Sequence, residues 1–507
     1  MAMERSVSRR NLIRGGLAGV GALTLVVLAG CGGTKSVEAV KEAPVDKAAK
    51  TEADKAITQD AAEATHERVT LEVAFPANGS NAEKLMTDIV IPGFTSKNPW
   101  IEVKYEGTPS SEYGKNLLTR IDAGAAPDVF LQEDVILPSL SARGAVVNLD
   151  EFWKRDAEQI KTVVGEDSSI DHRLNAHYGL ARNAVVTAML YNREHFEKAG
   201  VEPPAIAGPW TWQEWLQNMR KLTWDKERRS PTDTGFDPES VEQWGYWSRQ
   251  SDMALEWAPW IMQNGGRMLD PETRKSTLDN AFVTEAMDFI NRATWNYHVA
   301  PTPDQVAAAG KDYHVMFLSG RCASMSTLLG QESQYPTPAN SKFEIKAMVL
   351  PHKKLKGVEH GVVRGASAIH QQMMIGKASK AQEDAWAFMV FQAIDEESSK
   401  GVFTVANDGL PADTRYWRSP EVLQRDSYPR EIDVFIDPFE TGLVAGSPAP
   451  AYAHPLWPNL AWTEWHQAIK AAFDEFINNR TSIAEGVKRA QKDSQDVLDR
   501  AYQQVGG

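Results

Sequence analysis

Cysteine is almost absent from the chain, which has only Cys31 and Cys322 among its 507 residues. Two cysteines cannot build the disulfide framework that supports small secreted folds. A chain of this length buries enough apolar surface to be stable without one. We therefore expect a fold that depends on its hydrophobic core, with Cys322 as a small buried hydrophobe in an apolar strand.

Basic residues are in the minority. The sequence has 54 Lys and Arg against 68 Asp and Glu, which gives a formal net charge of -14. No basic run follows the N-terminal 30 residues. Proteins that bind nucleic acids need a basic surface to displace counterions from the phosphates, so nucleic acid is excluded as a partner.

Catalytic and metal-binding motifs are also missing. The sequence contains no Gly-x-Ser-x-Gly elbow and no His-Glu-x-x-His motif. No internal repeat of fixed period is present either, which argues against solenoids and propellers. His172 and His177 have no further ligands nearby, so we interpret them as structural or surface residues. We predict neither a metal nor a cofactor, and no enzymatic activity.

A long hydrophobic run is missing too. The apolar stretch at residues 19–29 supplies about half of the roughly 20 residues that a membrane-spanning helix needs. It leads into Leu28-Ala29-Gly30-Cys31, the pattern of a lipoprotein signal with a small-residue cleavage site. Residues 1–30 are therefore predicted to be a signal peptide. Lipidation of Cys31 would then anchor the mature chain on the extracytoplasmic face of the membrane.

Two segments flank this apolar stretch. Ser8-Arg9-Arg10-Asn11-Leu12-Ile13-Arg14 resembles a twin-arginine export signal, and an ordinary secretory signal with paired arginines is the alternative. Residues 31–66 are rich in Ala, Lys, Glu, Asp and Thr and contain almost no large apolar side chains. This composition is typical of a disordered tether, so the folded part is expected to start at residue 67.

Strand and helix patterns alternate from residue 69 onward. The order βαβαβ predicts a parallel sheet covered by helices. The chain is much longer than one typical domain, which favours two α/β lobes over a single large sheet. The first predicted strands are residues 69–75, 101–105 and 128–131, the first helices are 82–94 (kinked at Pro92) and 112–123, and two amphipathic helices fill 462–505.

Several motifs resemble, in order, the extracellular solute-binding proteins of family 1, which deliver carbohydrates to ATP-driven importers. Together they cover nearly all of the chain from residue 69. The motifs are Ile91-Pro92-Gly93-Phe94, Ala123-Gly124-Ala125-Ala126-Pro127-Asp128, Leu190-Tyr191-Asn192-Arg193-Glu194, Trp210-Thr211-Trp212, Asn264-Gly265-Gly266, Phe317-Leu318-Ser319-Gly320-Arg321 and Gly409-Leu410-Pro411-Ala412.

The resemblance implies a two-lobed, periplasmic-binding-protein-like α/β fold of type II. The ligand cleft would lie between two discontinuous lobes joined by crossing strands. The crossings are expected near residues 185–187, 363–365 and 409–412. The N-terminal lobe would then comprise residues 67–185 and 364–410, and the C-terminal lobe residues 186–363 and 411–507.

Polar side chains follow two of the predicted strands. Ligands bind beyond the carboxyl ends of strands in open α/β sheets, so these loops are candidate ligand contacts, as the resemblance also implies. A turn with a helix cap and a solvated helical turn are the structural alternatives. The candidates are Asn78, Ser80 and Asn81 after the first strand, and Gln132, Glu133 and Asp134 after the strand at 128–131; Asn183, Gly365 and Ser367 near the crossings are further choices.

Aromatic platforms are expected because sugars present apolar C–H faces, and the chain has 16 tryptophans. Trp257 and Trp260 precede Asn264-Gly265-Gly266, where the resemblance implies ligand contacts. Trp462 and Trp465 follow near a helix start, and Trp465 is the predicted platform. For any single tryptophan, a place in the core is the competing interpretation.

These observations predict a monomeric, lipid-anchored protein that captures a mono- or oligosaccharide and delivers it to the permease subunits of an ABC transporter. Two alternatives stay open. Glu133 and Glu256 could be the paired carboxylates of an exported glycosidase. The ligand could also be a solute such as a phosphorylated polyol, although the candidate loops contain little arginine.

Overall fold

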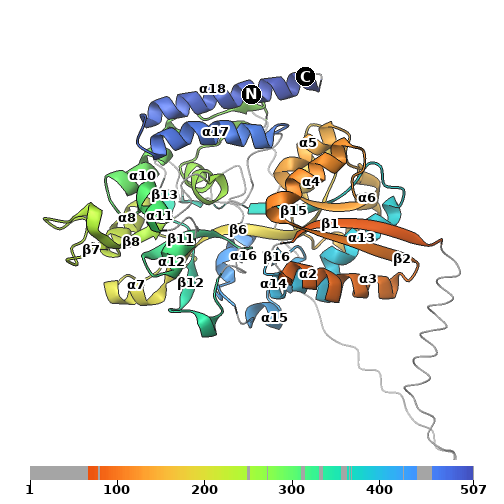
Figure 1. Ribbon diagram of the computed structural model, residues 1–507, viewed down its shortest axis with the longest axis horizontal. Coiled ribbons are helices and arrows are strands. Elements are labelled where there is room, and N and C mark those ends of the chain that lie inside the picture. Colours follow the sequence, from red (N-terminus) through yellow and green to blue (C-terminus); the bar gives the residue numbers. More distant parts are fainter. Residues whose placement is uncertain are drawn as a thin grey trace, which may run out of the picture. The chain divides into compact units, whose positions relative to one another are not determined.

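In the described part of the chain, ten strands form one mixed sheet (Figure 1). The strand order is β2-β1-β3-β15-β6-β11-β8-β7, and β12 and β16 also pair with β6. The predicted signal peptide, Cys31 and the tether lie outside the described residues. The computed structural model describes residues 67–77, 80–247, 252–270, 272–309, 314–330, 335–354, 362–364, 366, 368–425, 427–441 and 459–505.

The strands at one edge of the sheet are parallel. β1 (Val69–Ala77) pairs in parallel with both β2 (Ile101–Pro109) and β3 (Val129–Glu133). Alternate side chains of β1, such as Leu71 and Val73, are buried, as the period of a strand requires. The predicted βαβαβ start is therefore confirmed, and each strand runs a few residues further than the pattern indicated.

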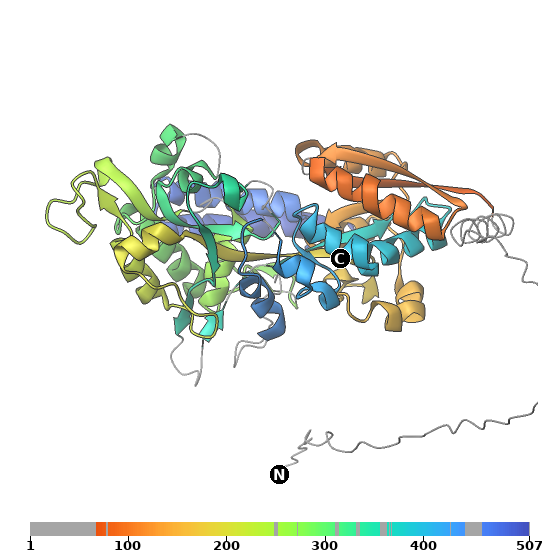
Figure 2. The ribbon, with the colours of Figure 1, turned by 90° about the horizontal axis from the view of Figure 1, so that it is seen from below.

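The strand β6 belongs to both halves of the sheet (Figure 2). Its first half, up to Val186, pairs antiparallel with β15, and its second half, from Thr187, pairs antiparallel with β11 and β12. β16 pairs with Asn183 and Ala184. The bounds are β6 Leu180–Asn192, β15 Ala368–Ile375, β11 Cys322–Leu328, β12 Ile345–Met348, β16 Leu410–Pro411, β8 Val241–Trp247 and β7 Trp224–Asp225.

Two groups of buried side chains accompany the two halves of the sheet. One group covers β1, β3 and β15, and we call these elements, β2 and their helices the first lobe. The other covers β8, β11 and β12, and we call these elements, β7 and their helices the second lobe. β15 is far from β1 to β3 in sequence, so the first lobe is discontinuous. The predicted two-lobed α/β fold is confirmed, but the expectation of two lobes in place of a single large sheet is wrong, because β6 joins the strands of both lobes into one sheet.

Helices pack against the sheet in both lobes. The last two, α17 and α18, pack along each other in the second lobe and confirm the predicted C-terminal helices (Figure 1). First-lobe helices are α2 Ser80–Lys84, α3 Ile91–Lys97, α4 Ser110–Asp122, α5 Leu137–Ala142, α6 Asp150–Ile160, α13 Gln382–Ile394 and α14 Glu396–Thr404. Second-lobe helices are α7 Arg193–Ala199, α8 Trp212–Lys221, α9 Ala258–Gln263, α10 Ala281–Trp295, α11 Pro303–Ala309, α12 Val315–Leu318, α15 Pro420–Leu423, α16 Asp433–Thr441, α17 Trp462–Ile477 and α18 Ile483–Gln504.

The predicted helix at residues 82–94 has a different form. A π-helical stretch, Leu85–Val90, separates α2 from α3, so the chain leaves α-helical geometry before Pro92 and not at it. Pro92 lies in the first turn of α3, directly after the π-helical stretch. Among the described helices, none has the length and apolar character that crossing a membrane requires.

Candidate functional site

The polar cluster at the carboxyl end of β3 divides into accessible and buried side chains. Gln132 is half-buried and Glu133 is exposed to solvent, whereas Asp134 is only 1% exposed. Asp134 Oδ2 accepts a hydrogen bond of 3.2 Å from the backbone N–H of His370 on β15. The side chain of Asp134 therefore ties β3 to β15 and does not face solvent, in contrast to the role predicted for it.

Glu133 is an unusual carboxylic acid. Its side chain is reached by solvent, yet the surrounding protein displaces enough water to raise its pKa to about 7. The negative charges of Asp134 and Asp252 raise the pKa of Glu133 further. Asp252 belongs to the second lobe, so the carboxylates of Glu133 and Asp252 interact although they come from opposite lobes.

Asp252 lies just beyond β8 and was not predicted as a site residue. Its carboxylate caps a π-helical turn, Met253–Trp257, by accepting a hydrogen bond of 3.0 Å from the backbone N–H of Leu255. β8 is parallel to β11, so Asp252 follows the carboxyl end of a strand, which is the position that ligand-binding residues favour in α/β sheets. That rule could have found Asp252 if β8 had been recognised in the sequence.

The three predicted tryptophan platforms lie in the core of the second lobe. Their exposures are 1% for Trp257, 2% for Trp260 and 0% for Trp465. Trp260 packs against the ring of Trp215 at 5.1 Å, and Trp465 Nε1 donates a 2.8 Å hydrogen bond to Ser276 Oγ. A stacking platform needs an open ring face, so the burial of these side chains contradicts the role predicted for them.

Trp462, at the first turn of α17, is the more accessible aromatic of that region. It is half-buried, stacks on Trp465 with ring centroids 5.7 Å apart, and lies 5.7 Å from the ring of His466. Burial lowers the pKa of His466, and the charge of Asp252 partly opposes this effect. Trp462 thus contacts His466, His466 interacts with Asp252, and Asp252 alone of the three interacts electrostatically with Glu133.

The other predicted polar residues have different surroundings. Asn81 on α2 is half-buried. Asn183 is 0% exposed, and its Nδ2 donates a 2.9 Å hydrogen bond to Gln371 Oε1, so its side chain is used within the sheet. Ser80 begins α2, but its side chain is not described. Asn78, Gly365 and Ser367 lie outside the described residues.

Glu256, the second carboxylate of the glycosidase alternative, is buried at 1% exposure. Its Oε2 accepts a 2.8 Å hydrogen bond from the hydroxyl of Tyr246, whose oxygen also lies 2.6 Å from Ser326 Oγ. A carboxylate enclosed in this way cannot flank a glycosidic bond alongside Glu133. The arrangement therefore gives no support to hydrolysis by this pair.

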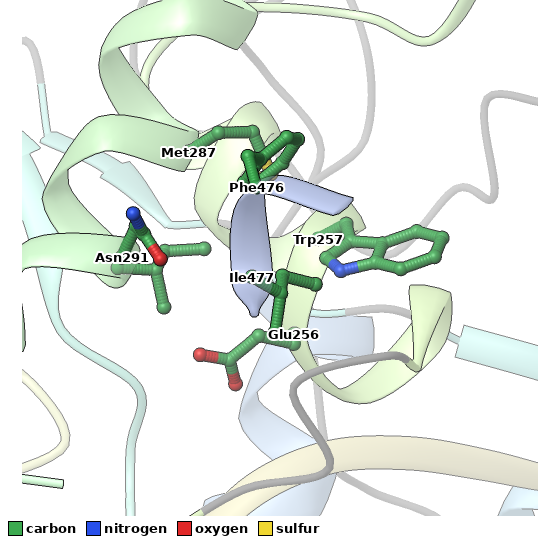
Figure 3. A pocket seen from close by; sticks show the side chains of 7 residues that line it. Glu256, Trp257, Met287, Asn291, Phe476 and Ile477 are labelled. Carbon is green, nitrogen blue, oxygen red and sulfur yellow. The ribbon is translucent and has the colours of Figure 1, made fainter. Parts of the chain in front are cut away.

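A small cavity lies within the second lobe, between the π-helical turn, α10 and α17 (Figure 3). Its volume of about 20 Å³ is enough for one water molecule and too small for a sugar ring. We assign it no ligand. Its lining residues are Glu256, Trp257, Met287, Ile290, Asn291, Phe476 and Ile477.

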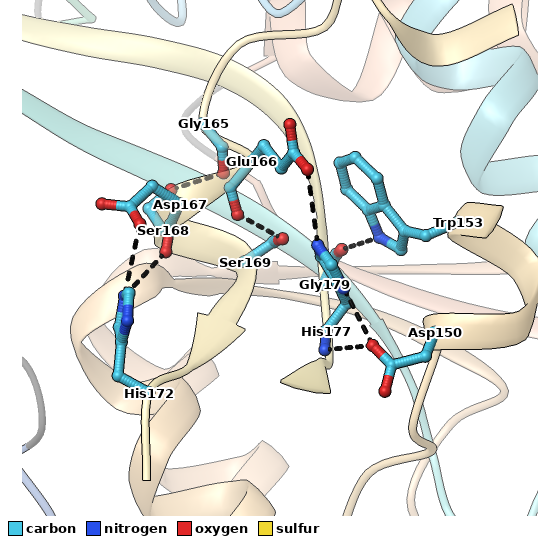
Figure 4. A network of polar contacts seen from close by, with 10 residues as sticks. All are labelled: Asp150, Trp153, Gly165, Glu166, Asp167, Ser168, Ser169, His172, His177 and Gly179. Carbon is cyan, nitrogen blue, oxygen red and sulfur yellow. Dashed lines mark hydrogen bonds and ion pairs between the residues drawn. The ribbon is translucent and has the colours of Figure 1, made fainter. Parts of the chain in front are cut away.

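His177 lies in a polar network of the first lobe (Figure 4). Its Nδ1 is 2.8 Å from Asp150 Oδ1, and its ring stacks on Trp153 with centroids 4.6 Å apart. Although burial opposes it, hydrogen bonds from His177 lower the pKa of Asp150. Within the described residues, no group of three or more His, Cys, Asp or Glu side chains has the arrangement of a metal site. His177 is thus held in the packing of the first lobe by Asp150 and Trp153.

Cys322 begins β11 and is completely buried as a free cysteine. Burial raises the pKa of its thiol. The prediction that Cys322 is a small hydrophobe in an apolar strand is confirmed.

Known proteins resemble this chain in sequence and in fold. An arabinooligosaccharide-binding protein of Bacillus subtilis is 25% identical over 330 residues, which are 64% of this chain and 66% of that relative, just under two thirds of its length. An ABC substrate-binding protein of Listeria monocytogenes, solved in complex with cycloalternan, has a TM-score of 0.68 at 18% identity and covers 85% of this chain and 100% of its own. A solute-binding protein of Thermotoga lettingae bound with α-D-tagatose has a TM-score of 0.65 at 18% identity, with 85% and 99% covered.

The family profile described as bacterial extracellular solute-binding protein matches residues 75–396. The matched region contains the end of β1 and all of β3, β6, β8, β11 and β15, which are strands of both lobes. More than half of the chain is matched, and so this chain belongs to the bacterial extracellular solute-binding proteins.

Proposed function

We propose that this protein binds a mono- or oligosaccharide between its two lobes and delivers it to the permease of an ABC transporter. Family membership supports the capture of a solute. The arabinooligosaccharide-binding relative and the sugar-bound structural neighbours favour a carbohydrate. The observation that carries the proposal is the family match over residues 75–396, and the electrostatic link between Glu133 of the first lobe and Asp252 of the second supports a site between the lobes.

The interaction between Glu133 and Asp252 indicates that the ligand has to supply hydrogen-bond donors. Two carboxylates repel each other when their lobes approach, which opposes closure of the empty protein. Sugar hydroxyls can donate hydrogen bonds to both carboxylates and so replace the water that closure removes. The half-buried ring of Trp462 adds an apolar surface for the C–H face of a sugar. Ligand contacts from both lobes then favour the closed state, which is the state presented to a permease.

The location follows from the N-terminal segment. A lipid on Cys31 would hold the folded part outside the cytoplasmic membrane, and residues 31–66 would give it reach. Export by the twin-arginine route, the monomeric state and the predicted lobe boundaries are parts of the same proposal. Palmitate labelling of the wild-type chain in bacteria, with Cys31→Ala as control, tests the anchor directly.

The binding proposal is tested by thermal melting of the purified chain with arabinotriose, maltose, tagatose and a sugar phosphate. A ligand that binds only the folded state adds about 2.7 kcal/mol of stability at a hundredfold excess over its dissociation constant. We expect a neutral sugar to raise the melting temperature and to be recovered unchanged. Hydrolysis of the oligosaccharide would instead indicate an enzyme, and no shift with any of the neutral sugars would overturn the choice of a carbohydrate.

A further inference from the structure

A β-bulge in β6 determines where the side chain of Arg182 points. The register between β6 and β15 shifts between Gln371 and Gln372, which pair with Asn183 and Ala181. Arg182 is therefore the extra residue of the bulge and has no partner in β15. Bulges re-aim side chains next to functional regions, and this one lies just before the point where β6 changes lobes.

The side chain of Arg182 forms a buried ion pair with Asp408. Arg182 NH1 lies 2.5 Å from Asp408 Oδ2, and the two side chains are only 3% and 9% exposed. Burial raises the pKa of Asp408, and the charge of Arg182 opposes that effect. Asp408 directly precedes β16, the segment that also pairs with β6. The ion pair therefore connects two of the segments that meet at the junction of the lobes.

Asn183 and Gln371 bring β15 into the same cluster. Asn183 Nδ2 donates to Gln371 Oε1 and to the backbone carbonyl of Asp408, and Gln371 Oε1 also accepts from Arg182 NH1 at 3.4 Å. Four side chains thus join β6, β15 and the start of β16. We call Arg182, Asn183, Gln371 and Asp408 the junction cluster.

Gly409 directly follows the junction cluster and has a backbone conformation that requires glycine. Its φ of +89° belongs to the left-handed region that favours glycine, and a Cβ there would lie 2.8 Å from the carbonyl oxygen of Ala184. β6 pairs with β15 up to Val186 and with β11 from Thr187 onward. The cluster therefore ends where the change of partners begins.

The junction cluster also contacts the end of β1. The guanidinium of Arg182 lies over the ring of Phe75, 5.8 Å from its centroid. Phe75 is near the end of β1, so this contact ties the junction cluster to the parallel strands of the first lobe.

We propose that the junction cluster is the rigid base of the hinge and confines the movement of the lobes to the residues just beyond it, Val185 to Thr187 of β6 and Gly409. Arg182 and Asp408 are positioning residues in this proposal, because they act on lobe orientation and touch no ligand. This proposal rests on the proposed function, because a hinge serves to close the lobes around a ligand. The test of the hinge needs no ligand, so its result is independent of whether the protein binds a sugar.

The test measures the distance between the lobes in the full chain by electron paramagnetic resonance. Nitroxide labels are attached through Lys104→Cys on β2 and Lys221→Cys at the end of α8, both exposed positions. Cys31→Ala removes the N-terminal thiol, and Cys322 is fully buried and does not react. The distribution of label distances is compared with and without the ion pair.

The variant is Arg182→Met with Asp408→Leu, because removing one partner alone would leave a buried charge and threaten folding. We expect a cooperative melt and a distance distribution at least twofold wider than in the parent. The control is Arg120→Met, which breaks ion pairs of 2.8 Å with Glu72 and Glu106 inside the first lobe and should leave the distribution unchanged.

An unchanged distribution in the double variant would overturn the proposal, as would equal broadening in Arg120→Met. If the double variant does not fold, Arg182→Lys keeps the charge but cannot reach Asp408 and Gln371 together, and an unchanged width there would be equally decisive. For any sugar that binds the parent, the dissociation constant of the double variant should differ severalfold from that of the parent.

Discussion

The two lobes use their aromatic side chains in different ways. Of the 16 tryptophans in the chain, the first lobe contains only Trp100, Trp153 and Trp386 among its described residues. The second lobe contains the other described tryptophans, and five of them are buried in its core around α8, α9 and α17, namely Trp212, Trp215, Trp257, Trp260 and Trp465. Abundant tryptophan is therefore a property of one core and not of the candidate site.

In the candidate site, polar side chains outnumber aromatic ones. The first lobe supplies Glu133 and Gln132, which are polar and reached by solvent, while the second lobe supplies Asp252, His466 and one accessible ring, Trp462. A composition rich in aromatics thus says little about stacking platforms. The useful question is which tryptophan the packing of the core has not already enclosed.

Removal of a core tryptophan should have the largest effect. Trp260→Ala deletes a ring that is 2% exposed and packs on Trp212 and Trp215, so we expect a loss of about 3–5 kcal/mol in the free energy of unfolding. Urea denaturation measures it. Trp386→Ala is the first-lobe counterpart and should cost as much, since Trp386 is 1% exposed and donates a 2.7 Å hydrogen bond to Asp156. A loss below 1 kcal/mol for Trp260→Ala would show that this ring is not part of the core.

Close backbone contacts should be the next most sensitive positions in both lobes. A Cβ on Gly245 would lie 2.3 Å from the carbonyl oxygen of Met219, and one on Gly376 would lie 2.4 Å from that of Pro127. Gly245→Ala and Gly376→Ala should each destabilise the fold by at least about 1–3 kcal/mol in chemical denaturation. The control is Gly114→Ala in α4, where no atom lies within 4 Å and the change should stabilise by up to about 1 kcal/mol.

Trp462→Ala distinguishes a role in ligand binding from a role in the core. We expect the dissociation constant of the bound sugar to rise about tenfold, a loss of about 1.4 kcal/mol in binding free energy, measured by isothermal titration calorimetry. The melting temperature without ligand should change much less than in Trp260→Ala, because Trp462 is only half-buried. Unchanged affinity together with a large loss of stability would place Trp462 in the core with the other tryptophans.

Glu133→Gln should have the smallest effect and should depend on pH. The pKa of Glu133 is raised from 4.5 to about 7, so the folded state holds this proton more tightly than the unfolded state does. The folded wild type therefore loses stability as the pH rises from 4.5 to 7, and the variant avoids this loss. We expect the variant to be more stable at pH 8, by less than about 1 kcal/mol because solvent screens the exposed carboxylate, and equal to the wild type at pH 4.

Chemical denaturation at both pH values measures this difference. Asp150→Asn is the matched control, because the pKa of Asp150 is lowered. It should lose stability at neutral pH and approach the wild type only as the pH falls below 3.8, the ordinary pKa of Asp150. A Glu133→Gln variant that is less stable at pH 8 would contradict the raised pKa.

Local patterns were sufficient to predict the framework. β1 follows from alternating side chains, β3 from a short buried run, and α17 and α18 from helical spacing, because these patterns are local in the sequence. The candidate site was predicted only in part. Trp462 and Trp465 lie three residues apart at the start of α17, and only the contact of Trp465 with Ser276, distant in the sequence, decides which one is enclosed.

Other features depend on contacts between distant segments and could not be predicted. Asp134 was predicted to contact the ligand beside Glu133. Its side chain instead accepts a hydrogen bond from the backbone of His370, and this contact depends on the pairing of β3 with β15. Asn183 is similarly occupied by Gln371, and the bulge at Arg182 exists only in register with β15. The pairing with β15 determines what the side chains of Asp134, Asn183 and Arg182 contact. Because the paired strands are far apart in the sequence, no local pattern predicts these contacts.

The sharing of β6 has a consequence for how the chain unfolds. One half of this strand completes the sheet of the first lobe, and the other half completes that of the second. Loss of either lobe would leave half of a central strand without hydrogen-bonded neighbours, so neither core can melt and leave the other intact. We expect a single cooperative transition in spite of two cores, with the calorimetric enthalpy equal to the van't Hoff enthalpy. A ligand held anywhere along this sheet would then protect the whole folded chain from proteases.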